Sequence, residues 1–196
     1  MLFLGVEILS IPVYVLAGSD KRNTYSNEAA FKYFLLGAFA SGFLLLGITF
    51  VYGALGSFNI VQVASSAMTP YGVSQQLLVI GFLLILFAMA FKMSAVPFHF
   101  WAPDVYTGAP TVITAYMSTI VKIGAIAGFY RLFSVVLSFY SQYTFLLLII
   151  SVLTIVIGNI IAASQSNVKR LLAYSSIGHA GFIILGITVM NASTPY

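Results

Sequence analysis

The sequence predicts an all-α membrane protein, a six-helix transmembrane bundle whose third helix is broken. Hydrophobic residues make up 61% of the 196 residues and charged residues only 6%, against about 25% charged residues in ordinary soluble domains. Residues 33–91 and 132–168 contain no Asp, Glu, Lys or Arg. The apolar runs are about 20 residues long and do not alternate with polar residues, which favours spanning helices over barrel strands.

The chain divides into six apolar segments within one transmembrane domain, residues 1–196. Each segment is close to the ~20 residues that cross a bilayer, and they cover residues 2–18, 29–53, 75–97, 110–133, 143–163 and 171–190. The first segment lacks the basic flank of a secretory signal and carries Glu7, so we interpret it as a spanning helix. Because the chain begins and ends in spanning-type sequence, we expect it to be part of a longer protein.

The third segment is predicted to break near Pro97 and to continue as a helix to about residue 106. Pro97 removes a helical hydrogen bond, while apolar and aromatic sequence continues through His99 and Pro103. Non-helical backbone at membrane depth survives only where it is buried in protein or lines a wet cavity, and broken helices often build ion sites in transporters. The alternative is that Pro97 ends the helix at the interface, with Trp101 and Asp104 among the headgroups.

Ionisable residues inside the apolar segments are the candidate functional groups, because a charge at mid-membrane costs at least ~2.5–3.5 kcal/mol. They are Glu7, Lys92, Lys122 and His179. Their proton affinities change when a neighbour moves, which is what a proton relay requires. The alternative is a static ion pair that fixes helix packing, between Glu7 and either Lys92 or Lys32. Lys32 itself is either a buried residue or a snorkelling interfacial one.

Hydroxyl side chains in the fourth segment are predicted to form a polar track. Thr111, Thr114 and Ser118 precede Lys122 at spacings of three and four residues, which places them on one helix face. Ser118 and Thr119 are then placed to stabilise the ammonium group or a water beside it. The sixth segment repeats the pattern with Ser175, Ser176 and His179. The alternative for each hydroxyl is a hydrogen bond to its own helix backbone.

Several other functions are excluded by composition. The chain has no cysteine, so it holds no disulfide, thiolate nucleophile or cysteine-bound iron–sulfur cluster. It has no phosphate-binding loop or metal-ligand cluster, and His99 and His179 are expected to form hydrogen bonds rather than to bind metal. The eight basic residues form no continuous stripe, which argues against a nucleic-acid partner.

The basic residues predict an orientation. Lys21 and Arg22 lie in the first connection, Lys169 and Arg170 in the fifth, and Arg131 near the fourth. Cytoplasmic loops carry an excess of Lys and Arg. The first, third and fifth connections are therefore predicted to be cytoplasmic.

Two long runs carry a family resemblance. The first starts at Lys92 and reads Lys-Met-Ser-Ala-Val-Pro-Phe-His-Phe-Trp-Ala-Pro-Asp-Val-Tyr-Thr-Gly-Ala-Pro; the second starts at Gln165 and reads Gln-Ser-Asn-Val-Lys-Arg-Leu-Leu-Ala-Tyr-Ser-Ser-Ile-Gly-His-Ala-Gly. With these runs the chain resembles the antiporter-like membrane subunits of respiratory complex I, NADH:quinone oxidoreductase, over essentially its whole length. Val105 and Tyr106 stand where Mrp-type Na⁺/H⁺ antiporters tend to have an Ala-His pair.

The resemblance implies an antiporter-like inverted-repeat fold that translocates protons, driven by quinone reduction elsewhere in the complex. Glu7 matches a family glutamate that pairs with the broken-helix lysine, here Lys92. Lys122 matches the lysine of the family's central hydrophilic axis, and Lys32 matches a lysine near the Glu–Lys pair. The family's upstream helices and its later broken helix with a lysine are not among these residues, so the chain alone is not expected to pump.

The resemblance also implies where cofactors and partners belong. NADH, FMN, iron–sulfur clusters and quinone would sit in the parent complex, with none bound by this chain. Its partners would be other membrane subunits of complex I, the lipid bilayer and protons, in a bacterial inner membrane or an organellar one. Two rivals remain, a subunit of an Mrp-type cation/proton antiporter or membrane-bound hydrogenase, and a purely structural membrane scaffold.

Overall fold

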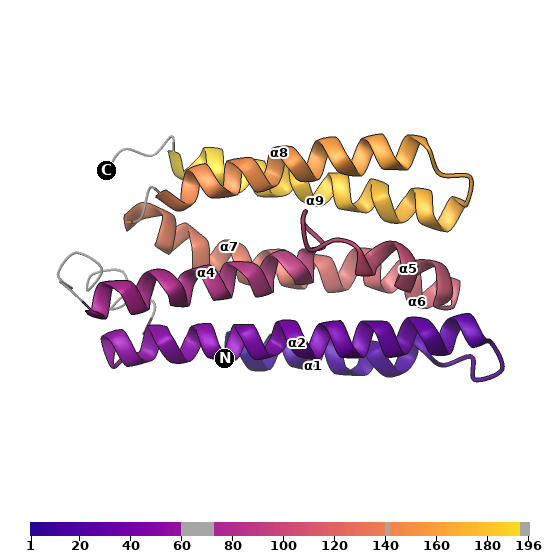
Figure 1. Cartoon of the computed structure of the whole chain (residues 1–196), viewed down its shortest axis with the longest axis horizontal. Coiled ribbons are helices and arrows are strands. Elements are labelled where there is room, and N and C mark those ends of the chain that lie inside the picture. Colours follow the sequence, from indigo (N-terminus) through magenta and orange to yellow (C-terminus); the bar gives the residue numbers. More distant parts are fainter. Residues whose placement is uncertain (60–72, 140–141, 193–196) are drawn as a thin grey trace.

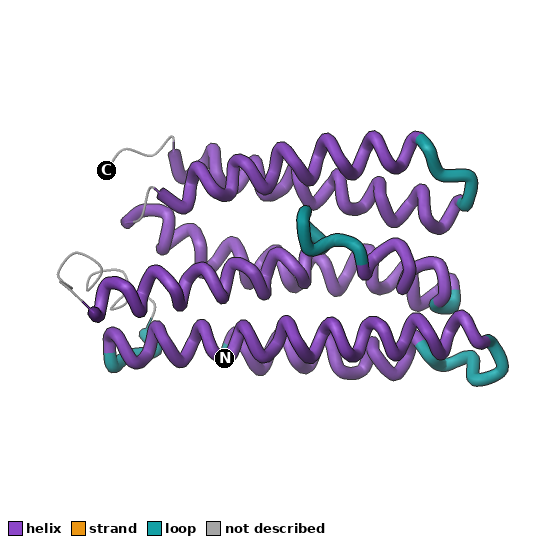
Figure 2. The backbone as a smooth tube through the Cα atoms, in the orientation of Figure 1, coloured by secondary structure: helices purple, strands orange, loops and turns teal. Residues whose placement is uncertain are grey.

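The computed structural model describes residues 1–59, 73–139 and 142–192, and in these ranges the chain is helical apart from short connections (Figures 1 and 2). The elements in chain order are α1 (Leu2–Ala17), α2 (Thr24–Leu55), α4 (Val73–Met93), α5 (Trp101–Gly108), α6 (Thr111–Tyr116), the π-helical turn η1 (Met117–Val121), α7 (Lys122–Phe139), α8 (Gln142–Ala163) and α9 (Val168–Ala192). The all-helical class predicted from composition is confirmed.

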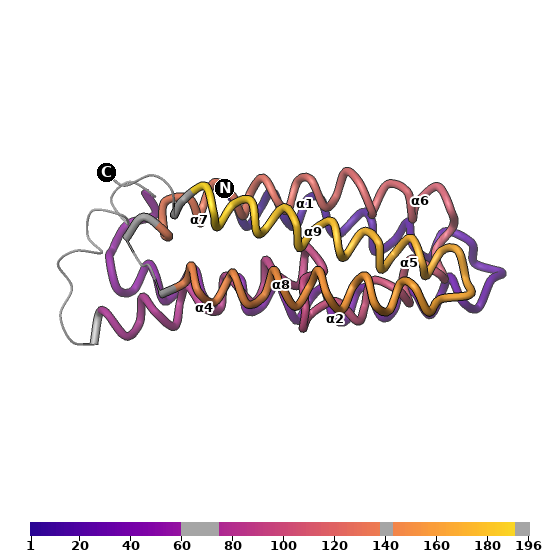
Figure 3. The backbone as a smooth tube through the Cα atoms, turned by 90° about the horizontal axis from the view of Figure 1, so that it is seen from above, coloured from indigo at the N-terminus to yellow at the C-terminus, as the bar shows by residue number. Residues whose placement is uncertain are grey.

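The helices pack in two layers. Figures 1 and 3 show α2, α4 and α8 in one layer and α1, α7 and α9 in the other, with α5 lying beyond the end of α4 and α6 leading into α7. The first, third and fifth connections lie at the same end of the bundle, on the right in Figure 1. This end, called the basic end below, carries Lys21, Arg22, Lys169 and Arg170.

Five helical stretches among the described residues are long and apolar enough to cross a membrane, which makes the chain a multi-pass membrane protein. They are Thr24–Leu55, Gln75–Met93, Thr111–Leu137, Tyr143–Ala163 and Val168–Met190. The α1 helix is apolar but has only 16 residues, roughly 24 Å at 1.5 Å per residue. It is therefore shorter than the ~30 Å hydrocarbon core.

The α2 helix begins earlier than the apolar segment expected from the sequence, because a polar residue caps its start. The α2 helix begins at Thr24, ahead of the expected residue 29, because the Asn23 side chain accepts a hydrogen bond from the Tyr25 backbone N–H. Such a cap satisfies a donor that the helix start leaves free. Gly56 ends α2 in a left-handed conformation with φ of 66°. The length of the apolar segment underestimates the length of α2, because the first turn of this helix is polar.

The backbone leaves the α4 helix before Pro97. The α4 helix ends at Met93, and Ser94 follows with a φ of 60°. The Val96–Pro97 peptide bond is cis, and α5 starts only at Trp101. The α4 helix thus ends before the expected residue 97, because proline disfavours helical geometry both at its own position and at the residue before it.

An aromatic cluster occupies the core between α1, α2 and α5. Tyr14 and Tyr33 meet edge to face with ring centroids 4.7 Å apart, and Tyr33 stacks on Trp101 at 4.7 Å. Trp101 in turn meets Tyr106 at 6.0 Å. All four rings are buried, and the Trp101 Nε1–H donates to the Phe91 carbonyl at 3.0 Å. Trp101 therefore lies in the protein core.

Candidate functional site

The buried Lys92 lies near the end of α4 and faces α1. Its Nζ donates to Ser10 Oγ at 2.9 Å and to the Tyr14 hydroxyl at 3.0 Å, and it lies 3.9 Å from Glu7 Oε1. The three α1 partners are spaced by three and four residues, which puts them on one helix face. From α2, the Ser41 hydroxyl donates to Glu7 Oε1. The structure thus brings together the two residues expected to pair, and adds hydroxyls that the sequence did not single out.

The second buried lysine, Lys122, starts α7 directly after η1 and faces α9. Its side chain is 5% exposed, and its Nζ donates to the Ser176 carbonyl at 3.0 Å and to Ser176 Oγ at 2.9 Å. The Nζ also lies 6.0 Å from the centre of the Tyr106 ring. Within the described residues no carboxylate pairs with Lys122, so its charge is held by neutral groups.

Among the described residues, Lys122 Nζ makes its hydrogen bonds to Ser176 and not to Ser118 or Thr119, which were expected to stabilise the ammonium group or a water beside it. Both hydroxyls donate to the Ala115 carbonyl of their own helix, at 3.0 and 2.8 Å. The π-helical turn η1 lies between α6 and Lys122 and departs from the 3.6-residue period on which the predicted face depended. Ser176 of α9 takes the place that the sequence assigned to these hydroxyls.

The polar track nevertheless lines a cavity. A pocket of about 350 Å³ lies between α6, η1 and α9, and its lining includes Thr111, Thr114, Ser118, Ser175, Ser176 and His179. Lys169, at the basic end, also lines it. His179 is exposed on α9, one turn beyond Ser176, the residue that binds Lys122. The two hydroxyl sets therefore line one cavity together, and Ser176, which accepts hydrogen bonds from Lys122, is part of its wall.

Lys32 does not lie with the Glu7–Lys92 pair. Its Nζ contacts Glu28 Oε1 at 2.7 Å and Asp104 Oδ2 at 3.3 Å, and its side chain is 41% exposed. Ser41, which holds Glu7, is nine residues further along α2, roughly 13 Å at 1.5 Å per residue. This corrects the expectation that Lys32 lies near the Glu7–Lys92 pair, because the stretch of α2 between Lys32 and Ser41 separates Lys32 from Glu7.

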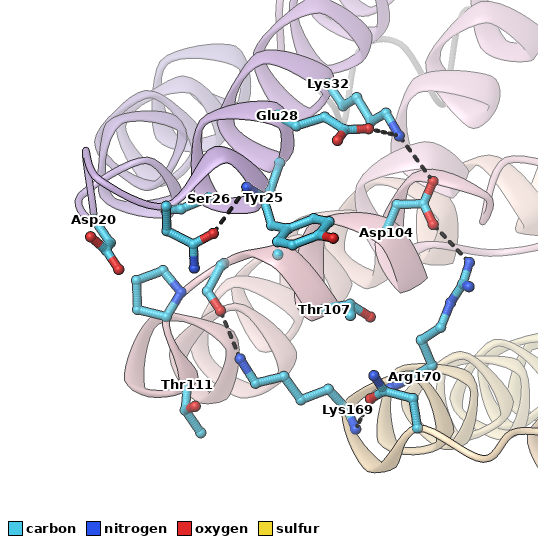
Figure 4. Close-up of a pocket in the computed structure, with 16 residues that line it drawn as sticks. Asp20, Tyr25, Ser26, Glu28, Lys32, Asp104, Thr107, Thr111, Lys169 and Arg170 are labelled. Atoms are coloured by element: carbon cyan, nitrogen blue, oxygen red, sulfur yellow. Dashed lines mark hydrogen bonds and ion pairs between the residues drawn. The ribbon is translucent and has the colours of Figure 1, made fainter.

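Lys32 belongs instead to a charged cluster at the basic end, drawn in Figure 4. Asp104 of α5 bridges Lys32 of α2 and Arg170 of α9, whose Nη2 lies 2.8 Å from Asp104 Oδ1. Lys169 Nζ donates to the Ala109 carbonyl at 2.9 Å. A pocket of about 620 Å³ is lined by these groups. The signal that sequence analysis missed is that Asp104 is the last acidic residue in a chain whose later charges are all basic.

The residues of the predicted helix break are spread over the α4–α5 connection and the first turn of α5. Pro97 is exposed within it, and Pro103 is buried in the first turn of α5, where the missing proline N–H has no helical partner to lose. The ring of His99 is 6.4 Å from that of Tyr174, and its buried Nδ1 has no hydrogen-bond partner among the described residues. Neither His99 nor His179 belongs to a group of three or more His, Asp or Glu side chains in the described part of the chain.

Comparison with known proteins places this arrangement in a family. Residues 1–194 match the family described as NADH:quinone oxidoreductase/Mrp antiporter, transmembrane. NADH-quinone oxidoreductase subunit N of Cytophaga hutchinsonii is 50% identical over 194 residues, which cover 98% of this chain and 41% of that protein. The chain thus spans well under half the length of this curated relative.

Two solved structures share the fold. A chain of respiratory complex I from Thermus thermophilus with bound aureothin is 39% identical, with a TM-score of 0.78 over 94% of this chain and 39% of that one. A chain of the Mrp complex from Dietzia sp. DQ12-45-1b is 26% identical, with a TM-score of 0.84 over 95% of this chain and 35% of that one. The near-complete family match and these shared folds show that the chain belongs to the NADH:quinone oxidoreductase/Mrp antiporter transmembrane family.

Proposed function

We propose that this chain acts in proton translocation as membrane subunit N of an NADH:quinone oxidoreductase, driven by quinone reduction elsewhere in the complex. The 50% identity to a subunit N supports this assignment within the family. NADH, FMN, iron–sulfur clusters and quinone then bind to other parts of the complex. The chain's partners are the neighbouring membrane subunits and the lipids around them, in a bacterial inner membrane.

The observation that carries the proposal is the pair of lysines buried between apolar helices. Lys92 is 4% exposed and Lys122 is 5% exposed. A lysine at such depth is costly, and in membrane proteins it marks an ion or proton pathway. In the proposed mechanism a shift of Glu7 relative to Lys92 changes the proton affinity of Lys92, and the proton passes on towards Lys122.

The cavity lined by Ser176, the hydrogen-bond partner of Lys122, supports a route from that lysine to the basic end. Thr111, Thr114 and Ser118 line it from one side and His179 from the other. Hydroxyl and imidazole groups can orient water and pass protons along such a space. Lys32, with Asp104, is then a residue of the basic end that controls access rather than a member of the buried pair.

The finer features of the fold belong to the same proposal. We take α1 as a sixth crossing, with the local thinning or oligomeric contacts that a short helix needs. The connection from Ser94 to Phe100 is the proposed break of the third spanning helix, and the basic end is the proposed cytoplasmic face.

The test uses the complete NADH:quinone oxidoreductase that contains this chain. Lys92→Ala and Lys122→Ala are each expected to lower protons pumped per electron, since a proton-transfer group contributes roughly 10²-fold or more to its step. Lys21→Ala, in the exposed first connection, serves as the control of equal chemistry. Normal pumping per electron in both lysine variants would overturn the proposal and favour a structural scaffold.

A second candidate is a subunit of an Mrp-type cation/proton antiporter or a membrane-bound hydrogenase. The observation that favours the antiporter is the TM-score to the Mrp chain, which is 0.84 and therefore higher than the 0.78 to the complex I chain. The discriminating measurement is proton flux into sealed vesicles without NADH. Flux that depends on an added cation gradient supports the antiporter, and flux only during NADH oxidation supports subunit N.

A further inference from the structure

The ammonium group of Lys92 lies closer to two hydroxyls than to its carboxylate. Its Nζ is 2.9 Å from Ser10 Oγ and 3.0 Å from the Tyr14 hydroxyl, whereas Glu7 Oε1 is 3.9 Å away. The first two distances are those of hydrogen bonds and the third is not. Glu7 Oε1 meanwhile accepts a hydrogen bond from Ser41. Each member of the pair therefore has a neutral partner of its own.

The Ser10 hydroxyl is oriented to receive Lys92. Ser10 is 1% exposed, and its hydroxyl donates to the Val6 carbonyl one turn earlier at 2.7 Å. A serine has one O–H to donate and two lone pairs to accept with. Because the backbone takes the proton, the lone pairs remain for the ammonium of Lys92.

The Tyr14 hydroxyl is held in place by α2. The ring packs edge to face against Tyr33, and its hydroxyl lies over Gly37. A Cβ built on Gly37 would lie 2.3 Å from that hydroxyl, closer than any van der Waals contact allows. The absence of a side chain at this position of α2 is therefore what lets the hydroxyl of Tyr14 reach Lys92.

We infer that Ser10 and Tyr14 are positioning residues that hold the Lys92 ammonium out of hydrogen-bond contact with Glu7 and so set how readily the ion pair closes. An ammonium group has three donors and needs partners for them when buried. Two of the three go to these hydroxyls. Removal of either hydroxyl leaves the carboxylate as the best remaining partner, and the pair closes. The effect on pumping rests on the proposed function, whereas the effect on the distance between Lys92 and Glu7 does not.

The experiment is made on the complete complex with Tyr14→Phe and Ser10→Ala, which each remove one hydroxyl and keep the packing volume nearly unchanged. High-resolution structures of both variants are expected to show Lys92 Nζ within hydrogen-bond distance of Glu7. Protons pumped per electron should fall, by roughly tenfold if the whole change in equilibrium that one hydrogen bond to a charged group represents at the low end of its range is felt in pumping. NADH oxidation and complex assembly should stay near the wild-type level.

Three further variants separate positioning from a structural role. Ser10→Thr keeps a hydroxyl and should restore pumping, and Gly37→Ala should displace the Tyr14 hydroxyl and reproduce Tyr14→Phe without changing Tyr14. Tyr52→Phe, on an exposed tyrosine of α2, is the matched control and should behave as wild type. Loss of assembly in Ser10→Ala with no rescue by Ser10→Thr would overturn the inference for Ser10.

The outcome for Lys92→Ala keeps the two proposals apart. If Lys92→Ala abolishes pumping while Tyr14→Phe leaves both pumping and the Lys92–Glu7 distance unchanged, the positioning role is wrong and the proposed function stands. If Lys92→Ala and Lys122→Ala both pump normally, the proposed function is wrong. The distance measured in Tyr14→Phe then still decides whether the hydroxyls hold the ammonium.

Discussion

The two buried lysines are equally hidden but differently held. Lys92 is surrounded by side chains of α1, including a carboxylate at 3.9 Å, whereas Lys122 is held by the carbonyl and hydroxyl of one serine on α9. A carboxylate stabilises the positive charge of a lysine by electrostatic attraction, whereas a neutral group offers it only a hydrogen bond. A shift of Glu7 can therefore change the charge balance at Lys92 directly, whereas a shift of α9 changes the hydrogen bonds that Lys122 makes to neutral groups.

The largest expected effect is a difference in stability between variants that lack one or the other buried lysine. Lys92→Met leaves the Glu7 carboxylate with its hydrogen bond from Ser41 but without the facing positive charge, and should destabilise the subunit by about 3 kcal/mol, whereas replacing both partners of such a pair is close to neutral. Lys122→Met strands no acid among the described residues and should leave stability nearly unchanged. Thermal unfolding of the purified complex in detergent measures this. A Glu7→Gln, Lys92→Met double variant should recover most of the loss; no recovery would mean that the pair is not coupled.

The next effect concerns the neutral partner of Lys122. Ser176→Ala removes one of its two acceptors and should cost about 1.5 kcal/mol, the lower range for a hydrogen bond to a charged group. Ser175→Ala, which lines the same cavity, is the control. If Ser175→Ala lowers thermal stability and pumping as much as Ser176→Ala, the contact to Lys122 is not what matters.

A smaller effect is expected for the charged cluster at the basic end. Asp104 and Arg170 are 42% and 43% exposed, so solvent screens their interaction and Asp104→Asn should cost only about 0.5 kcal/mol. The loss should shrink further at high salt. Glu28→Gln, which leaves Lys32 with Asp104, should have less effect again. A salt-independent loss in Asp104→Asn would show that the cluster is shielded from solvent in the assembled complex.

The smallest effect is expected at the hydroxyls that bind their own helix. Thr119→Val removes a hydrogen bond to the Ala115 carbonyl and should change stability by less than about 0.5 kcal/mol. The comparison with Ser176→Ala tests which hydroxyl belongs to Lys122. Equal losses in unfolding temperature would restore the polar track as a direct partner of that lysine.

The site itself was only partly predictable. Sequence analysis named Glu7, Lys92 and Lys122 because charge in an apolar segment is conspicuous. It missed Ser10 and Tyr14, since single hydroxyls in apolar helices are common and their usual partner is the backbone. It also misplaced Lys32, because the family resemblance gave a neighbourhood but no distance along α2.

The sequence by itself determined the membrane class and the helical character, because every backbone N–H and C=O in lipid must find a partner within its own segment. Composition and run length are sufficient for that. Which side chains meet across helices was decided only by tertiary structure. The rotation of each helix depends on close approaches such as Gly37 under Tyr14 and on the extra residue in η1. These contacts join residues far apart in the chain, so no periodicity within one segment contains them.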